Sequence, residues 1–344
     1  MRAARSAKSS ACELCWRLAQ DAHVIVGTAM AWMVRSAAEK LGIPALGVLP
    51  SSCAPSRLHP PPMLPVYGLP QALNACLWWL NDTLQNRLML QPVNRARAVL
   101  GLQPLAAFTE HLFGDDNVLA VDPVVFPPDP AWRDRYPYIG FAFLDDPSPL
   151  DPALEAFLDA GEPAIYVGFG SMAFAEPERV ARCVREAVEQ LGQRCIVSGL
   201  VAKTFREAGT LPPEFFVARD APHAKLFPRC SAIVHHGGAG TTAAALRAGS
   251  AQVIMLVMLD QFHHAHHLVR AGLAPAAPRL AKISTAKLTR ALQQAFELPV
   301  EPRQTIAKRL QASAAGALFV ERLAQLTKHP SRVRNDSARP VGLE

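Results

Sequence analysis

Apolar positions in the first part of the chain recur in the short runs that are typical of buried strands. The predicted strands are residues 23–27, 43–49, 117–121 and 138–141. A helical stretch follows the first of them and ends at Leu41. Residues 71–100 carry apolar side chains at helical spacing, with a break or kink expected at Pro92. The front of the chain is therefore predicted to be α/β.

The second part alternates more regularly between strand and helix. Its predicted strands are residues 164–168, 194–198, 215–218, 232–235 and 253–257. Its predicted helices are residues 177–191, 241–248, 262–271, 284–296 and 303–327. This alternation predicts a parallel sheet covered by helices on both faces, with enough strands for a complete doubly wound domain.

A Pro-rich acidic segment, Asp145-Asp146-Pro147-Ser148-Pro149, separates the two parts. Such a composition suits an interdomain connection. We therefore predict an N-terminal domain over residues 1–145 and a C-terminal domain over residues 150–344. The first has too few strands for a complete doubly wound domain, so it is predicted to be incomplete.

Composition narrows the class of protein. Half of the 344 residues are hydrophobic and 19% are charged, which is typical of a soluble globular protein. No apolar run reaches the ~18 residues of a spanning helix, and no secretory signal pattern opens the chain, so a cytoplasmic location is predicted. The net charge of +6 sits partly at the chain ends, and no aromatic-interleaved basic patch occurs. Nucleic acid is therefore not a predicted partner, and the oligomeric state is left open.

Neither the cysteines nor the histidines predict a metal site. The pair Cys12 and Cys15 has no second pair at zinc-ligand spacing, so buried reduced thiols are expected. The histidine cluster comprises His263, His264, His266 and His267. Its i, i+4 pair could bind a divalent ion, but no carboxylate at fitting spacing accompanies it. A solvated or groove-lining helix without metal is favoured.

Three segments carry candidate ligand chemistry. The first, Gly168-Phe169-Gly170-Ser171-Met172-Ala173, follows a strand and fits the dinucleotide fingerprint. The next helix begins only near Pro177, and Ser198-Gly199 stands where an acid should hold a ribose. A turn that offers N–H groups and the Ser171 hydroxyl to a phosphate is favoured, with a dinucleotide oxidoreductase as the alternative.

The second segment is a glycine-rich turn, His235-His236-Gly237-Gly238-Ala239-Gly240-Thr241-Thr242, between a strand and a helix. Glycines let the backbone approach a ligand, and the helix N-terminus presents unpaired N–H groups. A phosphate or diphosphate is the expected guest, and an ordinary strand–turn–helix is the alternative.

The third segment is Asp260-Gln261, after the strand 253–257. A carboxylate and an amide suit adjacent sugar hydroxyls, whereas by itself such a pair is more often a helix N-cap. Its place at the carboxyl end of the sheet, beside the glycine turn, favours ligand binding.

In order and spacing, these segments resemble the C-terminal domain of the inverting family 1 glycosyltransferases, the antibiotic, macrolide, rhamnolipid and sterol enzymes among them. The resemblance is strong from Ala164 to Leu273 and also includes Ala218-Arg219-Asp220-Ala221-Pro222-His223. It implies two facing Rossmann-like domains of the GT-B type and no metal or other cofactor. The implied reaction moves a hexose from a UDP- or dTDP-sugar to an acceptor hydroxyl, with inversion.

The resemblance also implies roles for individual residues. Gly170 and Ser171 with the backbone of Gly238, Ala239, Gly240 and Thr241 would hold the diphosphate, and His236 would bond a phosphate oxygen. Asp260 and Gln261 would grip the sugar hydroxyls, and the segment ending at His223 would lie against the base. Departures occur at Asp220, where plant members have tryptophan, at Ala244 in place of a glutamate, and at His264-Ala265 in place of asparagine-alanine.

The front of the chain departs furthest from the family pattern. Family members begin with further strand–helix units that carry the acceptor-activating base, and no residue here matches that base. His59 and His111 are expected in loops and are not assigned to the role. A truncated chain that binds nucleotide sugar without transferring it is therefore the main alternative.

The acceptor pocket is not marked by a motif. Apolar residues from Pro60 to Leu77, followed by Trp78 and Trp79, suggest a lipophilic acceptor or a membrane-facing groove. Ordinary core packing explains them equally well.

Overall fold

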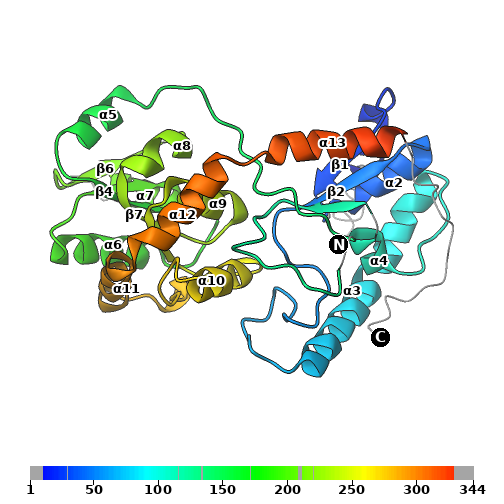
Figure 1. The fold of residues 1–344 in the computed structure, drawn as a ribbon, viewed down its shortest axis with the longest axis horizontal. Coiled ribbons are helices and arrows are strands. Elements are labelled where there is room, and N and C mark those ends of the chain that lie inside the picture. Colours follow the sequence, from blue (N-terminus) through cyan, green and yellow to red (C-terminus); the bar gives the residue numbers. More distant parts are fainter. Residues whose placement is uncertain are drawn as a thin grey trace. The chain divides into compact units, whose positions relative to one another are not determined.

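The computed structural model describes residues 11–28, 30–114, 116–132, 135–170, 172–207, 211–219 and 221–328. It divides into two compact units (Figure 1). The first comprises the described parts of residues 1–61, 66–142 and 314–344, and the second comprises residues 62–65 and 143–313. Each unit has its own parallel sheet, which confirms the predicted α/β class.

The second unit contains a sheet of five parallel strands. Their order in the sheet is β6-β5-β4-β7-β8. The strands are β4 (Ala164–Gly168), β5 (Cys195–Ser198), β6 (Phe215–Val217), β7 (Cys230–His235) and β8 (Ala251–Ile254). The chain runs from central β4 to one edge and then returns to build the other. This reversal between β4 and β7 is the switch point of a doubly wound sheet, as the sequence pattern predicts.

Two hydrophobic cores cover the two faces of this sheet. Along β4, Ile165 and Val167 pack into one core, whereas Ala164 and Tyr166 pack into the other. The alternation follows because successive strand side chains point to opposite faces. All five residues of β4 are buried, which explains why the strand reads as one continuous apolar run.

Helices surround the sheet. They are α5 (Pro152–Asp159), α6 (Pro177–Gln190), α7 (Gly199–Glu207), α8 (His223–Leu226), α9 (Ala239–Ala248), α10 (Gln261–Arg270), α11 (Thr285–Glu297) and α12 (Val300–Gln311). Helix α5 begins as an N-cap pattern requires, since the Asp151 carboxylate accepts from the N–H of Ala153 at 2.8 Å and Pro152 opens the first turn. Helices α5, α7 and α8 are absent from the sequence prediction because each is short and begins at or directly after a proline or glycine.

The first unit has a smaller sheet in the part of the chain described. Its strands β1 (Ile25–Thr28), β2 (Ala45–Leu49) and β3 (Asn117–Leu119) pair in that order and are all parallel. Its helices include α2 (Trp32–Leu41), α3 (Gln71–Val99) and α4 (Phe108–Phe113), and residues 11–18 are also helical. The strand predicted at 138–141 is wrong, since only Tyr138 pairs there, in a single bridge to Leu119.

Helix α3 continues through Pro92, so of the break or kink predicted there the break does not occur. A proline inside a helix removes one backbone donor and disfavours the preceding turn. Here the next turns are held by tertiary packing, because Val93, Ala96 and Arg97 are all buried. Packing of one helix face outweighs the local penalty.

The end of the chain also differs from the prediction. The single helix expected at 303–327 is two helices, α12 and α13 (Ala315–Lys328), separated at residues 312–314. Helix α13 belongs to the first unit, where Leu326 is buried with Leu46 and Val118 of the sheet (Figure 1). The domain boundaries predicted from the sequence place these residues in the second domain, because a helical pattern does not reveal which sheet it covers.

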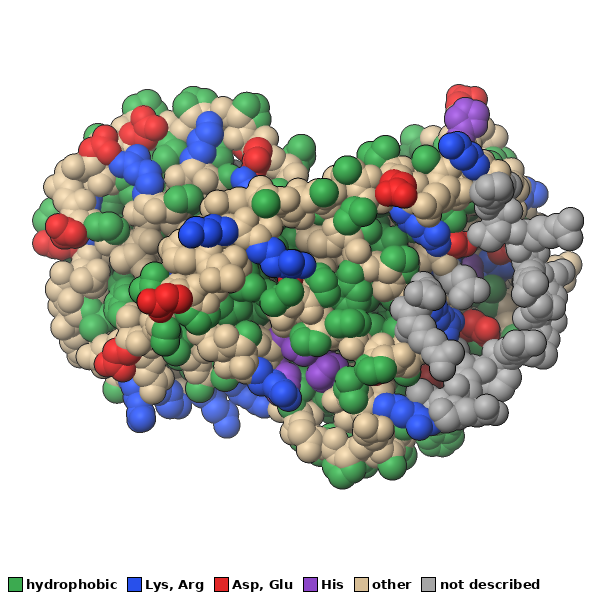
Figure 2. Space-filling view, in the orientation of Figure 1, with side chains coloured by type: hydrophobic (Ala, Val, Ile, Leu, Met, Phe, Trp, Pro, Cys, Tyr) green, Lys and Arg blue, Asp and Glu red, His purple; other side chains and the backbone are tan. Residues whose placement is uncertain are grey.

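The surface carries both signs of charge. On the face drawn in Figure 2, acidic and basic side chains are intermixed with hydrophobic and neutral ones over the helices of the second unit. Within the described residues, no helix combines the length and apolar character needed to cross a membrane.

Candidate functional site

Three loops meet at the carboxyl edge of the second sheet. Gly168 at the end of β4 is in register with His235 at the end of β7, and His235 is in register with Ile254 at the end of β8. The strands are parallel, so the segments that follow them leave the sheet on the same side. The structure thus brings together the Gly170 loop, the glycine turn and the Asp260 segment, at the switch point where doubly wound sheets bind ligands.

The Gly170 loop lies directly against its neighbours. Gly170 has a left-handed φ of 57°, and a Cβ there would lie 3.3 Å from the ring of His236. Gly199, the first residue of α7, approaches it so closely that a Cβ would lie 2.9 Å from the Gly170 carbonyl oxygen. Glycine at both positions allows this approach. Ser171, which the sequence predicts as a diphosphate ligand, lies outside the described residues, as does Asp220.

The glycine turn leads into a helix whose first turn has no side-chain cap. Gly238 occupies the N-cap of α9, and no side-chain capping bond is made there by the residues that the structure describes. The first helical hydrogen bond runs from the N–H of Thr242 to the carbonyl of Gly238 at 2.9 Å. The N–H groups of Ala239, Gly240 and Thr241 therefore have no intrahelical partner. The partial positive charge of the helix end is concentrated at these groups.

His236 lies beside this helix end. A Cβ at Gly238 would overlap its Nε2 atom, so the ring lies directly against this glycine. Its buried Nδ1 has no hydrogen-bond partner among the described residues. Burial lowers the pKa of His236, the nearby Asp260 carboxylate acts in the opposite direction, and His264 adds to the lowering. A half-buried imidazole with an unsatisfied nitrogen can bond an anionic oxygen.

Asp260 and Gln261 open helix α10. Asp260 stands at the N-cap position but makes no capping bond, so the N-cap alternative does not account for its side chain. The side-chain oxygen of Gln261 accepts from the N–H groups of Val257 at 2.8 Å and Met258 at 3.0 Å. Gln261 therefore holds the β8–α10 loop, and only its amide nitrogen remains to meet a ligand. Leu259, in the same β8–α10 loop, has a strained φ of 59°, and such strain is typical of functional loops.

Both polar backbone groups of Gly237 bond to buried histidines. Its N–H donates to His235 Nδ1 at 3.1 Å, and its carbonyl oxygen lies 2.7 Å from His264 Nδ1. The Nε2 of His235 lies 3.2 Å from the side-chain oxygen of Gln252 on β8. The sequence pattern predicts no role for His235, His264 or Gln252. The one signal was the histidine at 264, where related enzymes often have asparagine.

His223 begins helix α8. Its ring stacks on Phe227 with centroids 4.2 Å apart and meets the edge of Tyr166 at 5.8 Å. Burial lowers its pKa, and it is close enough to His235 that its charge would lower the pKa of that residue. His223 therefore belongs to an aromatic cluster on the same side of the sheet as the glycine turn.

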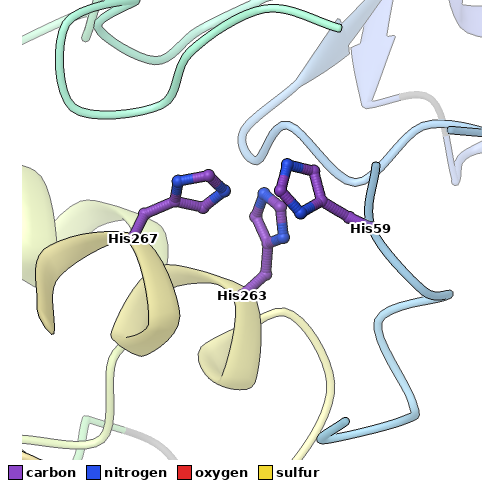
Figure 3. A group of neighbouring side chains, drawn as sticks. All are labelled: His59, His263 and His267. Atoms are coloured by element: carbon purple, nitrogen blue, oxygen red, sulfur yellow. The ribbon is translucent and has the colours of Figure 1, made fainter. Parts of the chain in front are cut away.

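The remaining histidines of α10 project from one side of the helix. The rings of His263 and His267 have centroids 4.4 Å apart (Figure 3, which also draws His59 of the first unit). Two nitrogen ligands are fewer than the four that zinc takes in structural sites. That the cluster holds no metal stays a prediction.

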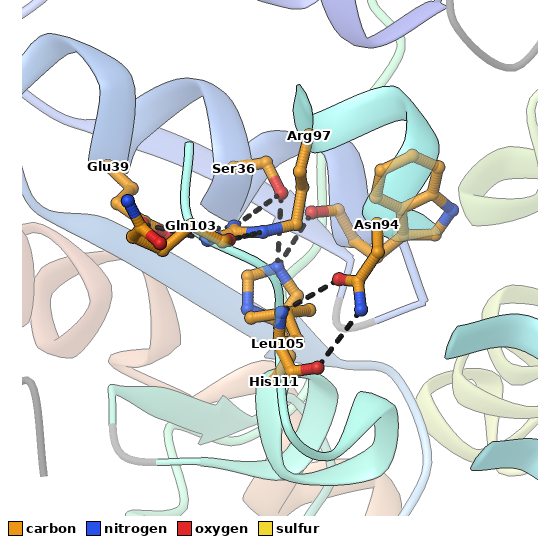
Figure 4. A network of polar contacts seen from close by, with 8 residues as sticks. Ser36, Glu39, Asn94, Arg97, Gln103, Leu105 and His111 are labelled. Carbon is orange, nitrogen blue, oxygen red and sulfur yellow. Dashed lines mark hydrogen bonds and ion pairs between the residues drawn. The ribbon is translucent and has the colours of Figure 1, made fainter. Parts of the chain in front are cut away.

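His111 has a structural environment. It lies in helix α4 and not in a loop, which corrects the sequence expectation. Its Nε2 lies 3.2 Å from the carbonyl oxygen of Trp32 and 3.4 Å from Ser36, beside buried Arg97 (Figure 4). Burial first, and then the nearby Arg97 cation, lower the pKa of His111 to about 4. This ring is part of a buried network and not of an open site.

Residues 183–318 match the family "Erythromycin biosynthesis protein CIII-like, C-terminal domain". The chain is 36% identical over 264 residues to the glycosyltransferase GtfE of Amycolatopsis orientalis. The aligned residues cover 74% of this chain and 62% of that protein. It is 30% identical over 284 residues to sterol 3-beta-glucosyltransferase UGT80B1 of Arabidopsis thaliana, and that alignment covers 79% of this chain and 45% of the relative. This chain is a glycosyltransferase homologue. The identification agrees with the family resemblance seen in the motifs.

A solved structure has the same fold. The glycosyltransferase VinC, crystallised in complex with dTDP, superposes with a TM-score of 0.62 at 19% identity, over 93% of this chain and 76% of that one. The predicted GT-B fold class is confirmed. The chain spans about three fifths of the length of the first bacterial relatives it matches, 62% and 59%. What the complete relatives do is therefore a basis for a proposal about this chain.

Proposed function

We propose that the second unit binds the diphosphate of a UDP- or dTDP-sugar at the glycine turn, and that the chain transfers the hexose to an acceptor hydroxyl with inversion. One observation carries the proposal. Three groups lie at one switch point: the first turn of α9, which has no side-chain cap, the unsatisfied Nδ1 of His236, and the Asp260 carboxylate, which makes no capping bond. Hydrogen-bond donors for an anion thus stand beside a carboxylate for hydroxyl groups.

The donors are placed for the leaving group of the reaction. When an acceptor oxygen attacks the anomeric carbon, the bond to the diphosphate breaks and negative charge grows on the departing oxygen. The N–H groups of Ala239, Gly240 and Thr241, the helix dipole and His236 offset this charge without reorganising. Attack from the opposite face inverts the anomeric centre. The described residues do not identify the base that takes the acceptor proton.

The sugar would contact the start of α10. Asp260 offers a carboxylate that accepts from hydroxyl groups, and the amide nitrogen of Gln261 can donate to a neighbouring hydroxyl. Because the Gln261 oxygen is already bonded to the loop, we assign this residue one ligand contact and a structural role.

The nucleotide is proposed from the similarity of the fold to a solved structure. VinC was crystallised with dTDP, which supports a thymidine or uridine diphosphate here. The aromatic cluster at His223 and Tyr166 would lie toward the base.

We assign the acceptor to a small lipophilic class. Trp78 is a core residue, since it is buried and its Nε1 donates to the His59 carbonyl at 2.8 Å. Trp79 is 64% exposed, and Leu80 and Leu84 of the same helix are exposed too. These apolar surfaces suit a lipophilic acceptor or contact with a lipid surface. The named relatives include sterol glucosyltransferases and a vancomycin aglycone glucosyltransferase.

Calorimetric titration tests donor binding. We expect UDP or dTDP to bind, with the same affinity in EDTA, and His236→Ala to weaken that binding by about tenfold. Asp260→Ala, the matched variant, should leave the nucleoside diphosphate affinity unchanged and weaken only the intact nucleotide sugar. If wild-type protein binds NADH and neither diphosphate, the dinucleotide alternative holds.

Turnover is tested separately. Release of UDP or dTDP from the nucleotide sugar is followed with a sterol or an aglycone as acceptor. Release that depends on the acceptor supports transfer. Tight donor binding without release would favour the alternative, a chain that binds nucleotide sugar without transferring it.

A further inference from the structure

The peptide groups on either side of Gly237 are held by two histidines from different elements. His235 ends β7, and His264 lies in the first turns of α10. His235 accepts from the N–H of Gly237 at 3.1 Å, and His264 faces the Gly237 carbonyl at 2.7 Å. Both rings are fully buried. A glycine in a turn thus has both of its polar groups bonded to side chains.

The bonding partners assign a different tautomer to each ring. A carbonyl oxygen only accepts, so Nδ1 of His264 carries the hydrogen. Nδ1 of His235 accepts from an N–H group, so its hydrogen is on Nε2, 3.2 Å from the acceptor oxygen of Gln252. Burial lowers the pKa of both rings, which favours their neutral forms. Each ring can therefore play only one of the two roles at Gly237.

Gly237 determines the direction of the segment that follows. Its φ of 86° is left-handed, and a Cβ would lie 2.8 Å from Cγ2 of Ile254. His236 precedes it, and the uncapped helix start at Gly238 follows it. A rotation of either peptide group of Gly237 would turn the His236 ring or the first N–H groups of α9. Glycine by itself does not resist such a rotation, because it has the widest backbone freedom.

We propose that His264 is a positioning residue for the diphosphate of the donor, acting together with His235 through Gly237. His264 does not touch the ligand. It donates to the Gly237 carbonyl and so keeps His236 and the N–H groups of Ala239 and Gly240 directed at the same point. The inference rests on the proposed function of the glycine turn, because it concerns where that turn places its donors.

Two substitutions separate positioning from general stability. His264→Leu removes the donor and keeps an apolar side chain in the buried space, whereas His264→Asn keeps a side-chain N–H that can reach the carbonyl. We expect His264→Leu to weaken UDP or dTDP binding by about tenfold, and His264→Asn to restore most of the loss. The corresponding monophosphate, UMP or dTMP, is titrated in parallel. A positioning role predicts a fall in the affinity ratio of diphosphate to monophosphate.

A merely structural role would lower the unfolding temperature and leave that ratio unchanged, which would overturn the proposal. If wild-type protein binds neither diphosphate, the proposed function fails instead, so the two failures are distinguishable. A measurement on wild-type protein covers the case in which His264→Leu does not fold. Nitrogen-15 NMR of labelled histidines should show the Nδ1–H tautomer at His264 and the Nε2–H tautomer at His235. An Nε2–H tautomer at His264 would contradict the inferred bond.

Discussion

The imidazole of His236 occupies a space that only glycine neighbours leave open. A Cβ at Gly170 would lie 3.3 Å from the ring, and a Cβ at Gly238 would overlap Nε2. The ring is therefore located by backbone on two sides. Its unsatisfied Nδ1 and its nearness to Asp260 follow from that location.

At this scale we predict the effect of one methyl group. Gly238→Ala displaces the His236 ring and should weaken UDP or dTDP binding by about tenfold, as His236→Ala does. In the double variant the two effects should not add, because both act through the same ring. Calorimetry on the four proteins measures the coupling. Additive losses would mean that Gly238 contributes to binding by another route.

At the scale of elements, the start of α9 is the main candidate for anion binding. Gly240 lies in its first turn, and outside the adjoining residues of that helix no atom lies within 4 Å of the position a Cβ would take there. A helical Cβ tilts toward the N-terminus, so it would extend into the space before the exposed N–H groups. The open space at Gly240 is therefore ligand space in our proposal.

Gly240→Ala should accordingly separate stability from binding. Alanine is favoured over glycine in a helix by about 0.5–1 kcal/mol, so the unfolding temperature should stay or rise. Affinity for UDP or dTDP should fall by about tenfold. Gly316→Ala is the matched control, since Gly316 also lies in the first turn of a helix, α13, with nothing within 4 Å. It should leave binding unchanged, and an equal loss in both variants would refute the assignment.

The network that joins helices α2, α3 and α4 predicts a dependence on pH. His111 is buried and its pKa is lowered to about 4. The unfolded chain binds this proton near pH 6.5 and the folded chain only near pH 4, so stability is lost as pH falls between these values. His111→Gln removes the titrating group.

The difference in unfolding free energy between wild type and His111→Gln is measured by urea denaturation at pH 7.5 and pH 5.5. When the pH falls from 7.5 to 5.5, we expect wild type to lose about 1.4 kcal/mol of unfolding free energy relative to His111→Gln. A difference that does not change with pH would mean that folding does not lower the pKa of His111.

At the scale of the whole molecule, the division into two units predicts that a substitution in the first unit can lower stability without changing the affinity for the donor. Arg97 is 2% exposed and makes a paired contact with Glu39, through Nη1 at 2.7 Å and Nη2 at 2.8 Å (Figure 4). Both residues lie in the first unit, whereas every described residue of the proposed diphosphate site lies in the second. Loss of the Glu39 carboxylate leaves a buried cation without its counter-charge.

Glu39→Gln should therefore destabilise the first unit by about 2–4 kcal/mol. The affinity for UDP or dTDP, measured well below the unfolding temperature, should stay within about twofold. Glu110→Gln, at an exposed glutamate of the same unit, is the control and should change stability by less than about 0.5 kcal/mol. A large loss of nucleotide affinity in Glu39→Gln would contradict the assignment of the site to the second unit.

Much of the second unit could be read from local pattern. Strand β4 spans 164–168, as predicted, because its residues form one apolar run ended by glycine. The glycine turn and Asp260-Gln261 were recognisable because each follows a strand, and parallel strands end on one side of a sheet. Local pattern thus predicted a doubly wound domain and the segments that meet at the carboxyl end of its sheet, and the family resemblance of those segments implied the GT-B fold class.

Tertiary structure decided what local pattern does not encode. Helix α13 packs with the first sheet, and α3 continues through Pro92, because long-range burial outweighs local signals. The partners of Gly237 come from residues 2 and 27 positions away, and the Gln252 contact joins two strands. The sequence does not distinguish a histidine that binds a ligand from one that acts as a base or donates a structural hydrogen bond. Only the packing around His264 shows which nitrogen donates and to what.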